Sequence, residues 1–368
     1  MPKVLVAGAS GLVGMAALKH FASLPGWDAV GVSRRCPVVD GIADHQFISV
    51  DLQNEQACRE VFAEMHDVTH LVYAALHEIP GLMPGWLDED VIETNAAMLR
   101  NLFEPLSDVA HNLRHVSLLH GTKAYGFHHP TVGLEGLRIP LRERDPIRPH
   151  RNFYFVQQEY LESKQRGRTW GLTTFRPTVI YGDASGANMN PAIAIGVYAA
   201  ILKEAGEPLH YPFRTLEPRL AEAVDAELVA RALAWAAANP VASGHAYNLT
   251  NGDVFVWSQA WARIASAMGM EVGEHRPMSF ANDLVKRSDE WAKIVSTHQL
   301  RAHRDLVEFV GYNSLVYCDV MVGSPSRPGT PILNSTILAR QHGFPDCLDT
   351  EDMFHNIFSR LRSQRFLP

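Results

Sequence analysis

The N-terminal stretch constrains the fold more than any other part of this 368-residue chain. Val4 to Val6 is a short apolar run, long enough for a buried strand and too short for a helix. Gly8, Gly11 and Gly14 follow at intervals of three, before a helix-like stretch from Met15 to Ala22. Such glycines allow a tight turn, close approach of backbone N–H groups to a pyrophosphate, and close helix packing. The pattern predicts a dinucleotide site at the helix N-terminus, with a purely structural turn as the alternative.

The end of the second expected strand, Ala29 to Ser33, indicates which dinucleotide is bound. An NAD site has Asp or Glu about 20 residues past the glycines. Here Arg34 and Arg35 follow the strand, and no carboxylate stands at its end. A guanidinium forms paired hydrogen bonds with a 2′-phosphate, which a carboxylate would repel. We therefore expect NADP(H); the alternative is that both arginines are solvated surface residues.

Strands and helices alternate through the first half of the chain, which predicts an α/β fold. Further strands are expected at Phe47–Val50, His70–Tyr73, Leu113–Leu119, Leu172–Arg176 and Ala246–Leu249. This alternation is typical of a Rossmann-type doubly wound parallel sheet, which binds ligands at the carboxyl ends of its strands. The rhythm weakens after Gly182, so a smaller, mostly helical C-terminal substrate-binding domain is expected. The predicted dinucleotide-binding domain is 1–182 with a return at about 220–252; the substrate-binding domain is 183–219 and 253–368.

Several segments between the strands carry specific expectations. Helices are expected at Gln56–Met65, Asp88–Phe103, Asn152–Gln165, Asn190–Glu204, Ala223–Ala238, Trp257–Met268, Ser279–Val295 and Ile337–Arg340. Asn95 could brace a neighbouring strand through its side-chain amide. Residues 121–150 read as a long loop, in which His128 and His129 are expected at the surface. Gly311–Pro331, rich in Gly, Pro, Ser and aromatic residues, is expected to be a flap over the site.

Composition limits the classes of function that need to be considered. The net charge of −7, without a run of Lys or Arg, argues against a nucleic-acid surface. No stretch approaches the ~20 apolar residues of a membrane-spanning helix, and the N-terminus reads as a strand rather than a signal peptide. The four cysteines lack metal-site spacing, so we expect reduced thiols, no metal and a cytoplasmic location.

The residues expected to carry chemistry depart from the usual reductase pattern. A short-chain reductase pairs Tyr with Lys four residues later on one helix face. Tyr160 and Lys164 have that spacing, but their position deep in the expected helix favours a surface pair. Tyr154 is followed by Gln158 instead. An unusual lysine, Lys123, stands where the fifth strand opens into the expected active-site face.

These departures occur together with further blocks of sequence that run in order along nearly the whole chain. The blocks are Gly121 to Tyr125, Asn152 to Tyr154, Glu159, Arg176-Pro177, Met189-Asn190, Val197 to Ala200, Asn248 to Trp257 and His342 to Phe344. With them the chain resembles the progesterone 5β-reductase/iridoid synthase-like family of extended (atypical) short-chain dehydrogenases/reductases. Departures remain, since Phe155 stands where a second Tyr is common and Tyr312 lies in a stretch without a clear counterpart.

The resemblance implies NADPH-dependent reduction of the C=C bond of an α,β-unsaturated carbonyl compound. By that likeness Tyr154 is the catalytic tyrosine, and Lys123 replaces the missing helix lysine from a different element. Lys123 is expected to favour phenolate-like character in Tyr154 by Coulomb attraction. The resemblance also implies that Asp51 bonds the adenine amine; the alternative, compatible with it, is that Asp51 caps a helix beginning near Asn54.

The full set of expected cofactor contacts is Gly8, Ser10, Gly11, Leu12, Val13, Gly14, Ser33, Arg34, Arg35, Asp51, Leu52, Ala74, Ala75, Tyr154, Pro177, Val179 and Met189. The expected partner is a small apolar enone or enal, with neither nucleic acid nor membrane, and a homodimer is possible. Alternative functions are an NADP-dependent carbonyl (1,2) reductase, a sugar-nucleotide epimerase of the extended type, and a non-catalytic NADP(H)-binding regulator.

Overall fold

The computed structural model describes residues 1–37, 47–322 and 331–368. Its main feature is a seven-stranded sheet with the order β11-β6-β5-β4-β1-β2-β3, in which every pairing is parallel. The strands are β1 (Lys3–Ala7), β2 (Asp28–Ser33), β3 (Phe47–Ser49), β4 (His70–Tyr73), β5 (His115–Leu119), β6 (Gly171–Pro177) and β11 (Ala246–Leu249). The strand order reverses after β3, which confirms the predicted doubly wound parallel sheet.

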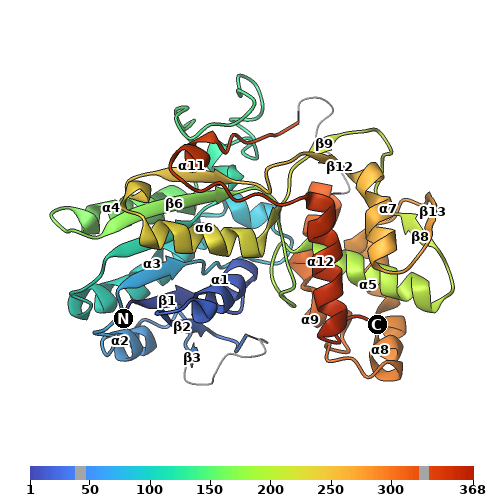
Figure 1. The fold of residues 1–368 in the computed structure, drawn as a ribbon, viewed down its shortest axis with the longest axis horizontal. Helices are drawn as coiled ribbons and strands as arrows, with labels where there is room; N and C mark the ends of the chain where they lie inside the picture. Colours follow the sequence, from blue (N-terminus) through green and yellow to red (C-terminus); the bar gives the residue numbers. More distant parts are fainter. Residues whose placement is uncertain (38–46, 323–330) are drawn as a thin grey trace.

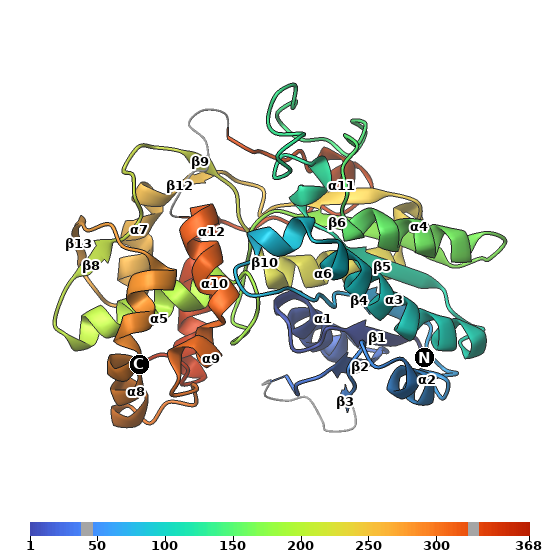
Figure 2. The ribbon, with the colours of Figure 1, turned by 180° about the vertical axis from the view of Figure 1, so that it is seen from behind.

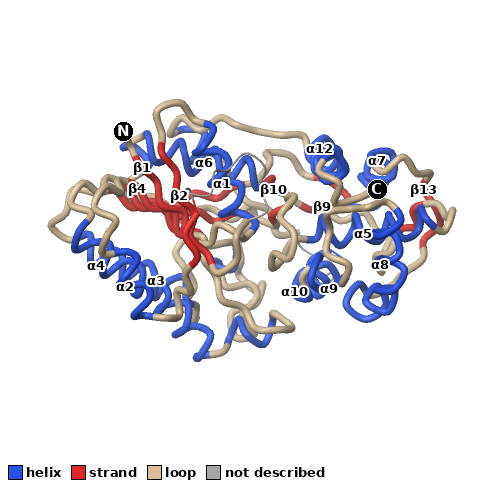
Figure 3. Tube along the Cα trace, turned by 90° about the horizontal axis from the view of Figure 1, so that it is seen from below, coloured by secondary structure: helices blue, strands red, loops and turns tan. Residues whose placement is uncertain are grey.

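Helices cover both faces of this sheet because its strands are apolar on both sides. In β1, Val4 and Val6 pack into one hydrophobic cluster, whereas Leu5 and Ala7 pack into another on the opposite face. Helices α1 (Leu12–Ser23) and α6 (Ala226–Ala238) cover the first face; α2 (Glu55–Phe62), α3 (Glu89–Val109) and α4 (Phe153–Gln165) cover the second, as Figure 3 shows.

The C-terminal half lies beside the sheet and is mostly helical (Figures 1 and 2). Its helices are α5 (Pro191–Glu204), α7 (Trp257–Ala267), α8 (Ser288–Thr297), α9 (Leu306–Val310), α10 (Tyr312–Tyr317) and α12 (Thr350–Ser363), and α11 (Ile337–Gln341) packs near β11. An aromatic core that includes Tyr198, Trp261 and Phe354 holds this half together. None of the helices in the described part of the chain is long and apolar enough to cross a membrane.

Short elements join the two halves. Two short strand pairs lie near the junction: β7 (Ile180–Tyr181) with β10 (Val224–Asp225), and β9 (Leu220–Ala221) with β12 (Phe255–Val256). A third pair, β8 (Leu209–Tyr211) with β13 (Val272–His275), packs against α7 at the outer edge of the C-terminal half (Figure 1). The single-turn elements are η2 (Met83–Leu87), η3 (Thr122–Tyr125), η4 (Pro240–Ala242), η5 (Phe280–Leu284), η6 (Val285–Arg287) and η7 (Cys318–Val322). The proposed domain boundaries remain a prediction.

The structure corrects several element assignments. The helix expected over Ser279–Val295 is divided into η5, η6 and α8. Asp319 holds the start of this segment: its carboxylate accepts hydrogen bonds from Ser279 Oγ and from the backbone N–H groups of Phe280 and Ala281. Helix α6 begins three residues later than expected, since Asp225 caps it. The sequence analysis also missed α12.

The expected flap, Gly311–Pro331, falls partly outside the described residues. Its first part forms α10 and η7 rather than an open loop. Tyr317 and Val320 from this part, together with Pro331, line the main cavity. The segment therefore borders the site, whereas its motion stays a prediction.

Candidate active site

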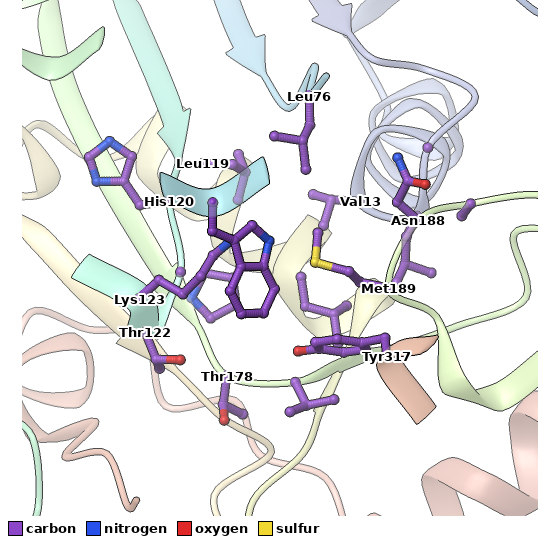
Figure 4. Close-up of a pocket in the computed structure, with 18 of the residues that line it drawn as sticks. Val13, Leu76, Leu119, His120, Thr122, Lys123, Thr178, Asn188, Met189 and Tyr317 are labelled. Atoms are coloured by element: carbon purple, nitrogen blue, oxygen red, sulfur yellow. The ribbon is translucent and has the colours of Figure 1, made fainter. Parts of the chain in front are cut away.

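A cavity of about 850 Å³ opens at the carboxyl ends of the parallel strands, where the fold class predicts a ligand site. Every expected cofactor contact except Gly14 lines it, from the glycine turn through the ends of β2, β3 and β4 to Tyr154 and Met189. Lys123 lines the same cavity. Figure 4 shows Lys123 and Tyr317 reaching into this space, with Val13 and Met189 nearby.

The glycine turn after β1 has the tight geometry that the sequence predicts. Gly8 has a φ of 84°, and a Cβ placed on it would lie 2.7 Å from the Ala74 carbonyl oxygen. A Cβ on Gly14 would lie 2.1 Å from the Gly8 carbonyl oxygen, so Gly14 serves close packing behind the turn and not the cavity wall. Gly11 caps α1 without a side chain, and the first turn of the helix has no acidic residue. The N-terminal N–H groups of α1 are therefore suited to an anionic ligand.

The two arginines after β2 differ in their surroundings. Both line the cavity. Arg35 crosses to the loop before α5, where its Nη2 donates a hydrogen bond to the Gly186 carbonyl oxygen at 2.9 Å. For Arg34 the hydrogen bond involves the backbone: its carbonyl oxygen accepts from Ser49 Oγ. The side chain of Arg34 is therefore the better placed of the two to meet a ligand phosphate.

Asp51 lies at the end of β3 and lines the cavity, as expected. Its Oδ1 accepts a hydrogen bond from the backbone N–H of Gln53 at 3.0 Å. The alternative role as a helix cap is wrong, because Asn54 caps α2 by accepting from the backbone N–H of Ala57. Asn95 does brace the backbone through its side chain, but in the loop after β4 rather than in a strand: its amide accepts from the backbone N–H of His77 and donates to the His77 carbonyl oxygen.

Tyr154 is held by its helix and by the end of β5. Asn152 caps α4 and accepts a hydrogen bond from the Tyr154 backbone N–H. The Tyr154 ring stacks on His120, with 4.5 Å between ring centroids. A Cβ on Gly121 would lie 3.1 Å from the Tyr154 hydroxyl oxygen, so a glycine at this position leaves room for that hydroxyl.

Lys123 comes from η3, and its Nζ lies 5.9 Å from the Tyr154 ring centroid. The structure thus brings together the two residues that the sequence analysis proposed as catalytic. Nζ also lies 4.0 Å from the Trp86 ring centroid and 3.9 Å from Glu78 Oε1. Burial lowers the pKa of Lys123 to about 8, and the Glu78 carboxylate opposes that change.

The electrostatics of Tyr154 correct one expectation. Burial raises the pKa of the Tyr154 hydroxyl well above its usual range, and the charge on Glu78 adds to the increase. The expectation that Lys123 gives this hydroxyl phenolate-like character is therefore wrong, because desolvation and the Glu78 charge both favour the neutral form. Tyr154 is a neutral hydroxyl that can donate a hydrogen bond to a ligand.

The sequence analysis missed other residues of the cavity wall. Trp86 and Tyr317 line it, and Glu78 stands behind Lys123. His128 also lines it, contrary to the surface position expected for it, and burial lowers its pKa to about 3. Tyr312, by contrast, is 43% exposed and does not line the cavity.

The pair with the regular Tyr-x-x-x-Lys spacing lies elsewhere. Tyr160 and Lys164 both bind the carboxylate of Glu104 on α3, at 2.9 Å and 2.6 Å respectively. Neither residue lines the cavity. The interpretation of this pair as lying outside the active site is confirmed, although both side chains are half-buried rather than fully at the surface.

Comparison with known proteins agrees with this architecture. The chain is 28% identical, over 99% of its length and 93% of the relative, to an (S)-8-oxocitronellyl enol synthase of Camptotheca acuminata. It is also 28% identical to a 3-oxo-Delta(4,5)-steroid 5-beta-reductase of Arabidopsis thaliana, over 99% of this chain and 92% of that one. These relatives confirm the resemblance to the progesterone 5β-reductase/iridoid synthase-like family.

Solved structures share the fold. The UDP-glucose 4-epimerase of Bifidobacterium longum, solved with NAD+ and UDP, matches with a TM-score of 0.65 at 14% identity, covering 98% of each chain. The family model for the NAD dependent epimerase/dehydratase family matches residues 4–250, which span the glycine turn, Lys123 and Tyr154. The chain therefore belongs to the NAD dependent epimerase/dehydratase family.

Proposed function

We propose that this protein is an NADPH-dependent reductase of the C=C bond of α,β-unsaturated carbonyl compounds. The observation that carries the proposal is the position of Lys123 beside Tyr154, supplied by η3 rather than by the next turn of α4. The regular Tyr-x-x-x-Lys relay of carbonyl reductases and epimerases is displaced in this chain. The names of the curated relatives, a steroid 5-beta-reductase and an enol synthase, support the same chemistry.

The residues present fit a phosphorylated dinucleotide. The turn at Gly8 leaves the space that a Cβ would fill, and the first turn of α1 presents its N–H groups without a competing acidic side chain. Arg34 lines the cavity at the end of β2, where the extra ribose phosphate of NADP(H) would distinguish it from NAD(H). When bound, NADPH supplies a hydride to the β-carbon of the substrate.

The side chains of this protein would stabilise the charge that gathers on the substrate carbonyl oxygen. Tyr154 would donate its O–H to that oxygen, and a donor contributes most where charge develops in the transition state. The Lys123 ammonium, whose Nζ lies 5.9 Å from the Tyr154 ring centroid, would add Coulomb attraction to the enolate. Trp86, Tyr317 and Phe213 give the cavity an aromatic wall suited to an apolar enone or enal.

Product analysis tests this proposal. Purified protein with NADPH would be offered cyclic enones, an enal and a steroid enone, and cofactor oxidation would be followed by absorbance. A saturated carbonyl product is the expected result. An allylic alcohol would indicate a carbonyl (1,2) reductase, and NADPH binding without oxidation across the panel would favour a non-catalytic binding protein. Either result would refute the assignment.

A further inference from the structure

Lys123 is surrounded by residues that do not take part in the proposed reaction themselves but contact its ammonium group. A lysine ammonium away from water is costly unless a charge or an aromatic face stabilises it. Only 14% of the Lys123 side chain is exposed. Its Nζ lies 4.0 Å from the Trp86 ring centroid and 3.9 Å from Glu78 Oε1. Two groups from one loop thus hold the charge that the proposed reaction needs.

Glu78 is unusual among the carboxylates of this protein. Its side chain is 1% exposed, and in the described residues neither of its oxygens has a hydrogen-bond partner within 3.5 Å. Burial raises the pKa of this carboxyl, and the Lys123 charge, followed by the Trp86 indole N–H, opposes that rise. A buried carboxylate without hydrogen bonds destabilises a fold unless a cation is near. The ion pair with Lys123 supplies that cation, so the two charges depend on each other.

The loop that carries Glu78 and Trp86 is anchored at several points. Asn95 binds both backbone groups of His77, directly before Glu78. Asn313 of α10 accepts from the Gly81 N–H at 3.0 Å and donates to the Ile79 carbonyl oxygen at 3.1 Å. Asp88 then caps α3. These bonds fix the loop on both sides of the ion pair, so Glu78 has a defined position relative to η3.

We propose that Glu78 is a positioning residue: it holds Lys123 against Trp86 and keeps its ammonium charged beside Tyr154. This inference rests on the proposed enone reduction. The other groups that face the pair are Tyr154 from α4, Tyr317 from α10 and the imidazole of His128 from the loop after η3. Burial lowers the pKa of that imidazole to about 3, so it is neutral and does not replace the carboxylate. Glu78 is the acidic partner of the lysine.

The pH dependence follows from this arrangement. The ammonium is the active form, so turnover falls as pH rises through the pKa of Lys123, about 8. An opposite charge within about 4–6 Å raises the pKa of a cation by roughly one to three units. Glu78→Gln keeps the shape and removes the charge. In this variant the decline of kcat at alkaline pH is expected to begin about one pH unit or more lower than in wild type. At a given pH within that decline, this shift corresponds to about a tenfold loss of turnover.

The experiment measures kcat against pH for wild type, Glu78→Gln and the control Glu143→Gln. Glu143 is a largely buried carboxylate that accepts from the Asn248 backbone N–H and does not line the cavity. A decline of kcat at lower pH in Glu78→Gln, but not in Glu143→Gln, supports the proposal. The same pH dependence of kcat in all three proteins overturns it. If Glu78→Gln does not fold, Glu78→Asp is measured in its place. A smaller shift of the alkaline decline of kcat to lower pH is expected, and an unchanged decline would refute the proposal.

A second measurement separates this inference from the proposed reaction. Titration of the Lys123 ammonium by nitrogen-15 NMR, assigned by its loss in Lys123→Met, needs no substrate. A lower Lys123 pKa in Glu78→Gln than in wild type supports the role of Glu78. An unchanged Lys123 pKa refutes it even where enones are reduced. If no enone is turned over but the Lys123 pKa is still lower in Glu78→Gln than in wild type, the proposed reaction is rejected while the role of Glu78 as partner of Lys123 is supported.

Discussion

Replacement of Tyr154 by phenylalanine removes one hydroxyl from the site and little else. The ring of Tyr154 stacks on His120 at 4.5 Å, and its backbone N–H is bonded to Asn152. A phenylalanine retains the ring and the backbone bond. The variant should therefore fold normally and bind NADPH with an affinity close to that of wild type.

The expected loss lies in the chemical step. A single donor aimed at a developing oxyanion contributes on the order of 10²–10³ in turnover, or about 2.7–4 kcal/mol. The hydroxyl is buried and neutral, and desolvation raises its pKa. A hydrogen bond from it to the substrate oxygen is therefore stronger than the same bond in water. Lys123 remains in place beside the ring, which would leave residual activity above the uncatalysed rate.

Single-turnover absorbance of NADPH with a small enone separates this step from cofactor release. Tyr160→Phe, on the same helix, is the matched control: Tyr160 bonds Glu104 away from the cavity, and its loss should leave the rate unchanged. Turnover of Tyr154→Phe within a few-fold of wild type, with cofactor bound, would refute the role of this hydroxyl.

Three further changes test other parts of the structure. Arg34→Ala should weaken NADPH binding by about 10–100-fold and NADH binding little, since it removes a charged hydrogen bond worth about 1.5–3 kcal/mol. Calorimetric titration with each cofactor measures this, and equal losses of affinity for both would contradict the prediction. Gly14→Ala places a Cβ 2.1 Å from the Gly8 carbonyl oxygen, so a loss of about 1–3 kcal/mol or more in unfolding free energy is expected from denaturant titration. Burial raises the pKa of Glu222 to about 7, so stability should fall as pH rises from about 4.5 to about 7 and then level; Glu222→Gln should flatten that fall, and an unchanged slope would exclude Glu222 as its source.

The sheet could be predicted from the sequence because its signals are local. Short apolar runs such as Val4 to Val6 are too brief for helices, and each is followed by a helical stretch. Helix α12 also had a signal that was not used: Met353, Phe354, Ile357 and Leu361 repeat at helical spacing and are buried on one face. The contact that holds the start of η5 could not be predicted, because its acceptor, Asp319, lies forty residues after Ser279.

The candidate site divides in the same way. Lys123 and Tyr154 belong to recognisable sequence blocks, and the structure places them together. Glu78 and Trp86 belong to the segment between β4 and α3, which contains η2 and no such block, and only tertiary contacts place them against Lys123. A surface position was expected for His128 because the His128-His129 pair precedes a proline in an expected loop, whereas His128 lines the cavity.

The anchored loop from His77 to Asp88 restricts how this protein could change. It follows the cavity-lining end of β4, carries the counter-charge of the lysine, and is tied to α10 of the C-terminal half through Asn313. An insertion or deletion here would disturb cofactor contacts, charge and cavity shape in a single step. Efforts to engineer a new substrate range would therefore do better with point changes at cavity-wall residues such as Phe213 or Val320, leaving the length of this loop intact.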